Sequence, residues 1–352
     1  MTPAPPWRPG AATGVGSLPY DDPLEACRIV FGELPELPHL PELPARGPGA
    51  SMIGRTCALL VDLGADLRPS GWRLTGARGG VRGGIDQQRA RSLLGADLDA
   101  LQIVGLERNV DQMPIKVQVT GPWTLAATVE RPSGGAVLGD SGARRDLAQS
   151  LAEGVAQHLA DLATRVPGAA FVVQFDEPAL PAVLRGAIPT PSGFSAYRPV
   201  EQAEARQLLE PVLAVADFPV VHCCAPDVPV SLLVEAGAKC LSFDLSLVGR
   251  SALDDYAAAI DGGVAILAGA VPTTRPVSGA APSDVDLAKQ ILRWWRMLGF
   301  DEEQAGERVV VTPACGLGDA DPAWTREVLT LVREAGAHLA DRREDEFEPG
   351  AP

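Results

Sequence analysis

The chain has 352 residues, a length that one α/β barrel commonly reaches. Hydrophobic residues make up 46% of it and charged residues 21%, so a large core can form without a disulfide framework. The net charge of −15 argues against nucleic acid and anionic membranes as partners, because both attract clustered lysine and arginine.

The compartment is predicted from what the sequence lacks. No apolar run reaches the roughly 18–20 residues of a membrane span. Residues 1–10 are rich in proline and do not contain the apolar core of a signal peptide. We therefore expect a cytoplasmic protein that acts on small molecules, in which the six cysteines are thiols or metal ligands rather than disulfides.

Short apolar runs alternate with amphipathic stretches along most of the chain. The runs that predict strands are 12–17, 71–75, 115–120, 170–176, 218–222, 240–245, 264–269 and 308–312. The clearest helical patterns are 143–165, 201–216, 229–237, 284–298 and 322–338. Strands that alternate with helices of this length predict a parallel α/β sheet. Eight of them predict a single (β/α)₈ TIM-type barrel over residues 1–340.

Three segments depart from this alternation. Residues 33–50 contain five prolines, so we expect a long structured loop there rather than a helix or a central strand. Residues 77–84 are rich in glycine but lack the flanking strand and helix of a nucleotide-binding loop, and a flexible turn is expected. The charged tail 341–352 is expected to be disordered.

The unusual polar residues lie at the carboxyl ends of predicted strands. They are Gly16 and Ser17, Asp176 and Glu177, His222 and Cys224, Asp244, and Cys315 just after the last strand. In a (β/α)₈ barrel these ends converge on one face, which carries the active site. Residues far apart in the sequence are therefore expected to meet in one pocket.

His222, Cys224 and Cys315 are candidate metal ligands. Alternate residues of a strand share a face, so His222 and Cys224 can point the same way. One imidazole and two thiolates suit zinc and leave a fourth position open, as in catalytic zinc sites. Asp244 can fill that position until a substrate arrives. The alternative is that these cysteines are small core residues, which is our interpretation of Cys27, Cys57, Cys223 and Cys240.

Two further features predict an amino-acid pocket. Asp176 and Glu177 leave a buried strand as adjacent carboxylates, and they are either loop acids and helix caps or a site for a substrate ammonium. Ser17 stands in a tight turn whose backbone N–H groups can bind a carboxylate, although an ordinary helix N-cap is also compatible with it.

Taken in order from residue 11 to about 335, these motifs resemble the C-terminal catalytic barrel of cobalamin-independent methionine synthase. The matching segments are GVGSLP, VTGPWTL, QFDEPAL, VVHCCAP, CLSFDLS and VVTPACGLG. The resemblance implies a zinc site made by His222, Cys224, Cys315 and Asp244, the last in place of a glutamate ligand of the family.

The resemblance also implies how the substrate binds. Asp176 would contact the substrate amino group, with Glu42 of the proline-rich segment as a second acid. Gly16 and Ser17 would contact its carboxylate. Asp176 and Asp244 are thus the candidate catalytic carboxylates.

We therefore predict a zinc-dependent methyltransferase that moves a methyl group to the thiol of homocysteine and forms methionine. The donor would be methyltetrahydrofolate or a methylcorrinoid, the latter presented by a methyl-carrier protein. The family's classical enzyme has a second barrel that helps to bind folate, so a single barrel is expected to use methyltetrahydrofolate poorly. The alternatives are a zinc alkyltransferase for a coenzyme-M-like thiol, a metal-free relative of uroporphyrinogen decarboxylase, and a non-catalytic zinc- or thiol-binding protein.

Overall fold

The computed structural model describes residues 5–75, 84–277 and 281–341. Six parallel strands form one curled sheet in the order β3-β4-β5-β6-β7-β8. Their bounds are β3 Pro114–Thr120, β4 Ala170–Asp176, β5 Pro219–Cys223, β6 Cys240–Asp244, β7 Ala265–Val271 and β8 Val309–Pro313. The glycine-rich stretch 77–84 and the tail 341–352, for which we predicted a turn and disorder, lie almost wholly outside the described residues.

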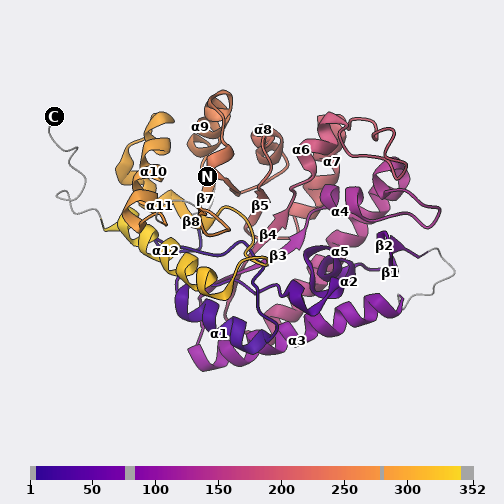
Figure 1. Ribbon diagram of the computed structural model, residues 1–352, viewed down its shortest axis with the longest axis horizontal. Helices are drawn as coiled ribbons and strands as arrows, with labels where there is room; N and C mark the ends of the chain where they lie inside the picture. Colours follow the sequence, from indigo (N-terminus) through magenta and orange to yellow (C-terminus); the bar gives the residue numbers. More distant parts are fainter. Residues whose placement is uncertain (1–4, 76–83, 278–280, 342–352) are drawn as a thin grey trace.

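Helices surround the strands on the outside of this sheet (Figure 1). They are α1 Pro23–Glu33, α2 Met52–Leu59, α3 Ile85–Arg108, α4 Pro122–Thr128, α5 Ser141–Arg165, α6 Leu180–Arg185, α7 Gln202–Leu213, α8 Val230–Glu235, α9 Leu253–Asp261, α10 Asp284–Met297, α11 Ala305–Arg308 and α12 Pro322–Ala340. The five predicted helical stretches are confirmed as α5, α7, α8, α10 and α12. No helix within the described ranges is both long enough and apolar enough to cross a bilayer.

Two irregular segments complete the wall of a TIM-type barrel. Residues 11–18 lie beside β8, where Thr13 donates its backbone N–H to Val311 at 3.1 Å. The same segment lies beside residues 38–42, with Leu18 donating to the carbonyl of Glu42 at 2.9 Å. Residues 38–42 in turn contact β3, where Leu40 donates to the carbonyl of Lys116 at 2.9 Å. These isolated parallel bridges close the ring of eight positions.

The second wall position is therefore not where the sequence placed it, and the interpretation of 71–75 as a barrel strand was wrong. The predicted strand 12–17 does lie in the wall, but it forms only isolated bridges. Residues 71–74 do form a strand, β2, but it pairs antiparallel with β1 (Ala65–Arg68) in a separate hairpin. The proline-rich segment is a structured loop without a regular strand, as predicted, and its isolated bridges supply the wall at Pro38 to Glu42. Proline lacks only the N–H, and here the carbonyl of Pro38 accepts from Lys116 while Leu40 and Glu42 donate.

Successive side chains of each strand point to opposite faces of the sheet and so pack into two separate hydrophobic cores. Residues that point outward, such as Val173 and Phe175 of β4, belong to the main core between the strands and the helices. Val172, Val220 and Leu267 point inward and fill the lower barrel, which Trp7 and Phe218 close with an edge-to-face contact at 5.1 Å. Above this apolar layer the inward side chains become polar, as in Gln174, His222 and Ser242, and this change marks the floor of the site.

Candidate metal and substrate site

A cavity of about 350 Å³ opens at the carboxyl ends of the strands. It is lined by seven of the eight predicted site residues, which are Gly16, Ser17, Glu42, Asp176, His222, Cys224 and Cys315. Asp244 is the exception. A larger groove of about 730 Å³ lies beside α5, but neither the histidine nor the cysteines line it. The barrel thus gathers residues from positions 16 to 315 into one pocket, as expected from the strand ends.

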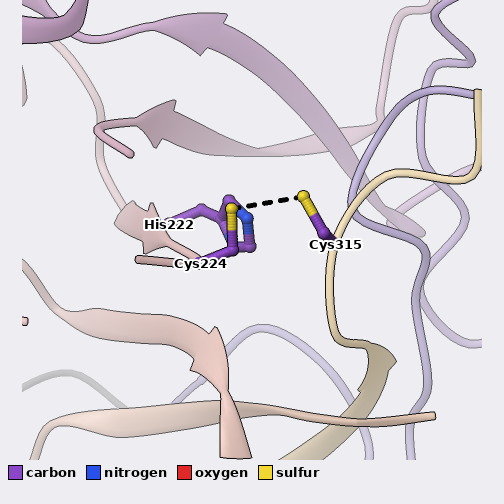
Figure 2. Close-up of side chains that lie close together, drawn as sticks. All are labelled: His222, Cys224 and Cys315. Atoms are coloured by element: carbon purple, nitrogen blue, oxygen red, sulfur yellow. Dashed lines mark hydrogen bonds between the residues drawn. The ribbon is translucent and has the colours of Figure 1, made fainter. Parts of the chain in front are cut away.

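His222, Cys224 and Cys315 form a compact group of soft ligands. One ligand atom from each lies within 4.8 Å of the others, and this is the only such group of three or more among the described residues. The sulfur atoms of Cys224 and Cys315 are 3.2 Å apart. Figure 2 shows His222 and Cys224 projecting from the end of β5 toward Cys315, which comes from the loop after β8. The two residues from β5 share a face, as the predicted strand alternation requires.

The imidazole of His222 is prepared to accept a metal at one nitrogen. Its Nδ1 lies 2.8 Å from the hydroxyl of Ser242 on the adjacent strand β6. Its Nε2 is buried and has no hydrogen-bond partner within the described structure. An unpartnered buried nitrogen costs free energy unless another group binds it. A hydrogen bond from Nδ1–H to Ser242 leaves the Nε2 lone pair facing the two sulfurs, as in metal-bound histidines.

The cysteine pair favours one thiolate. The hydrogen bond between the two sulfur atoms lowers the pKa of Cys315 to about 4, and the nearby His222 adds to this effect. The same contact raises the pKa of Cys224. These opposite shifts favour the thiolate at Cys315, and thiolates rather than thiols bind metals. Nitrogen and sulfur donors in this ratio match a zinc site with an open position.

Asp244 lies outside the group formed by His222, Cys224 and Cys315. It ends β6, as predicted, but its Oδ1 accepts hydrogen bonds from the backbone N–H of Ser246 at 2.9 Å and from its hydroxyl at 2.6 Å. The carboxylate therefore caps the short turn after the strand. This geometry gives no support to Asp244 as the fourth ligand, and the role stays a prediction.

Asp176 is a buried carboxylate at the wall of the cavity. Gln174, two residues earlier on β4, donates to its Oδ1 at 2.7 Å. Burial raises the pKa of Asp176 well above its ordinary value, and the nearby Glu42 raises it further, whereas Gln174 and Lys116 oppose the rise. A cationic group that enters the cavity would find a carboxylate that lacks a full set of partners.

Glu42 lies beside Asp176 and comes from the proline-rich segment. It is 4% exposed, and its Oε1 lies 3.8 Å from Nε of Arg55, a buried residue of α2. Arg55 is paired in turn with Asp97 of α3, which also binds Arg46 at 2.5 Å. Burial raises the pKa of Glu42, and Arg55 is the strongest influence against that rise. Glu42 therefore lies in the pocket, as predicted, and the proline-rich segment 33–50 carries it there.

Ser17 is bound to the loop that carries Cys315. Its carbonyl accepts from Leu317 at 2.8 Å, and its hydroxyl accepts from the N–H of Gly318 at 3.2 Å. A Cβ at Gly316 would overlap the Ser17 hydroxyl in its present position, so glycine allows this close approach. The turn at Gly16 and Ser17 and the loop after β8 thus form one side of the cavity.

A family model for the catalytic domain of cobalamin-independent synthases matches residues 11–338. The chain belongs to this family. Membership supports a methyltransferase of the cobalamin-independent synthase type. A comparison with curated proteins finds no match.

Solved structures share the fold of this family member. A methyltransferase from Methanosarcina mazei aligns with a TM-score of 0.55 and 16% identity, over 97% of this chain and 95% of that one. A B12-independent methionine synthase from Shewanella sp. W3-18-1, in complex with selenomethionine, aligns with a TM-score of 0.46 and 15% identity. That alignment covers 69% of this chain and 66% of the synthase, so the chain spans slightly less than two thirds of its length.

Several residues of the synthase-family pocket were not identified from the sequence. Met52, Pro44, Gly316 and Gly318 line the cavity. The two glycines beside Cys315 in PACGLG were a usable signal, because closely spaced glycines after a strand indicate a close backbone approach. Met52 had no such signal, since α2 was not predicted.

Glu177 was paired with Asp176 in the sequence analysis, but the structure gives it a different role. Its carboxylate accepts from the backbone N–H groups of Trp123 at 2.8 Å and Thr124 at 2.7 Å, and from the Thr124 hydroxyl at 2.8 Å. It therefore caps the first turn of α4, as the helix-cap alternative required. Burial raises the pKa of Glu177 to about 7, although these hydrogen bonds lower it.

We predict that Glu177→Gln lowers the free energy of unfolding by about 1–3 kcal/mol, because its amide NH₂ would face one of the α4 N–H donors. Urea unfolding at pH 8, where the carboxyl is ionised, would measure this loss. Glu210→Gln on the exposed face of α7 is the matched control and should change stability by less than about 0.5 kcal/mol. Equal stability of the two variants would contradict the capping role.

Proposed function

We propose that the protein transfers a methyl group to the thiol of homocysteine and so forms methionine, with a zinc ion held by His222, Cys224 and Cys315. The observation that carries this proposal is the joining of two kinds of group in one cavity. Three side chains that can bind a soft metal and two buried carboxylates line the same cavity. An amino acid that ends in a thiol has a sulfur for the metal and an ammonium for the carboxylates.

The ligand set suits zinc for chemical reasons. One nitrogen and two sulfur donors favour zinc over harder cations, and the three-ligand set leaves room for a substrate sulfur. When bound, zinc would lower the pKa of the substrate thiol and hold it as the nucleophilic thiolate at neutral pH. The proposed methyl donor is methyltetrahydrofolate or a methylcorrinoid on a carrier protein.

The protein's own residues would orient the amino acid. Asp176 and Glu42 would bind the ammonium, since each is buried and has no full set of partners. The turn at Gly16 and Ser17, held against the loop after β8, would receive the carboxylate. With the amino acid bound in this way, its sulfur would extend toward His222 and the cysteines, which line the same cavity.

We predict about one zinc per chain in protein purified with reductant, and its loss in Cys224→Ser and Cys315→Ser, because each change removes one of three ligands. Metal analysis after dialysis measures this. Cys223→Ser is the matched control, since Cys223 adjoins Cys224 but is buried on the opposite face of β5, and it should keep its zinc. Full zinc in both ligand variants would show that the site is misassigned.

The same metal analysis decides the role of Asp244. Loss of zinc from Asp244→Asn would make this carboxylate the fourth ligand despite its bonds to Ser246. Retained zinc would leave the fourth position to water or to the substrate.

We also predict that the zinc-loaded protein transfers a labelled methyl group to homocysteine and that Asp176→Asn weakens homocysteine binding. A carboxylate–ammonium contact contributes roughly 1.5–3 kcal/mol, so the loss in affinity should be on the order of ten- to a hundred-fold with zinc retained. Asp319→Asn, at an exposed position on the rim of the same cavity, is the control and should change affinity little. Unchanged affinity in Asp176→Asn would favour a thiol without an amino group, such as one of the coenzyme-M kind.

A further inference from the structure

A lysine is buried inside the barrel directly beneath the substrate cavity. Lys116 of β3 is fully buried, and its ammonium donates to the carbonyl of Val15 at 2.8 Å and to Oε1 of Gln174 at 2.8 Å. A longer contact of 3.4 Å reaches Oε1 of Gln118. The three N–H groups are therefore all used, and their acceptors belong to three different parts of the barrel wall.

This arrangement fixes the direction of two glutamine amides. A lysine ammonium has donors and no acceptor, so both glutamines must present their oxygen to it. Their nitrogens then point away. Gln174 Nε2 donates to Asp176 Oδ1 at 2.7 Å and to the Val15 carbonyl at 2.9 Å, and Gln118 Nε2 donates to the carbonyl of Leu40 at 2.5 Å. Lys116 and the Val15 carbonyl together hold the Gln174 amide with its nitrogen toward Asp176, because one binds the amide oxygen and the other accepts from the amide nitrogen.

Lys116 also balances the charge of the pocket. It lowers the pKa of Asp176 and of Glu42, against the effect of their burial. The two carboxylates act in return on Lys116, whose pKa burial lowers to about 8. The other charged groups around this cluster are Arg55 and Asp97, which act on Glu42, and Cys315, which acts on Asp176.

Filling the barrel does not require an amine here. The layer immediately below consists of apolar residues such as Val172, Val220 and Leu267, which fill the same interior without charge. Burying an ammonium costs several kcal/mol even when it is well paired. The hydrogen bonds of the ammonium offset part of this cost, and the anionic groups that act on it are the two carboxylates of the cavity.

We propose that Lys116 is a positioning residue for recognition of the substrate amino group. Through Gln174 it holds Asp176 by Oδ1, so that Oδ2, which no described hydrogen bond engages, stays free for an ammonium in the cavity. This inference rests on the proposed function, because it assumes an amino acid in the pocket. It assigns the discrimination between an amino acid and its des-amino analogue to a residue that does not touch the substrate.

The test compares two ligands that differ only in the amino group. Calorimetric titration of the zinc-loaded protein with methionine and with 4-(methylthio)butanoate gives the preference for the amino group. Lys116→Met and Gln174→Met keep side-chain size but remove the link to Asp176, and each should lower that preference on the order of ten- to a hundred-fold with zinc retained. If Lys116→Met does not fold, Gln174→Met decides the question.

Val172→Ala is the matched control. It alters the same strand two residues before Gln174 and inside the same barrel, so it should lower the melting temperature but keep the wild-type preference. Wild-type preference in Lys116→Met and Gln174→Met would overturn this inference alone. A wild-type protein without any preference would overturn the proposed function and the inference with it.

Discussion

The sulfur atoms of Cys224 and Cys315 lie 3.2 Å apart, although three strand spacings separate β5 from β8 in the sheet. Neighbouring strands are about 4.8 Å apart, so in a flat sheet these residues would be separated by roughly 14 Å. Only the curl of the sheet into a barrel brings them together. The remaining wall, at residues 11–18 and 38–42, closes that curl through a few backbone hydrogen bonds. The same segments carry Ser17 and Glu42, so the contacts that close the barrel also bring these two residues into the pocket.

The pocket contains several buried charged groups, and such groups are stable in a protein interior only when opposite charges lie nearby. Asp176 and Glu42 are both buried, and an unpaired buried charge costs several kcal/mol. Lys116 and Arg55 supply the opposite charge from below and from α2, with Asp97 holding Arg55 in place. Neither cation neutralises its carboxylate by direct close contact, since one acts through Gln174 and the other stands at 3.8 Å. Both carboxylates therefore keep capacity for an incoming ammonium.

The sequence predicted the strand ends well because they combine two strong local signals, an apolar run and a polar residue that follows it. These two signals were enough to predict that His222, Cys224 and Cys315 lie close together. The prediction failed at the second wall position, which was assigned to 71–75, because residues 38–42 complete the wall through isolated bridges that need only alternate N–H groups and leave no strand pattern in the sequence. The network around Lys116 was not predicted either, since a lone lysine in a strand gives no sign of its long-range acceptors. Glu177 and Asp176 look alike in sequence, and only the position of α4 separates their roles.

If the group of His222, Cys224 and Cys315 holds zinc, a substrate sulfur should bind at the open position of that ion. Zinc K-edge X-ray absorption of the purified protein, recorded before and after addition of homocysteine, counts the sulfur ligands. We predict two sulfur ligands at about 2.3 Å in the free protein and three after homocysteine binds. A sulfur count that stays at two with saturating homocysteine would contradict this prediction.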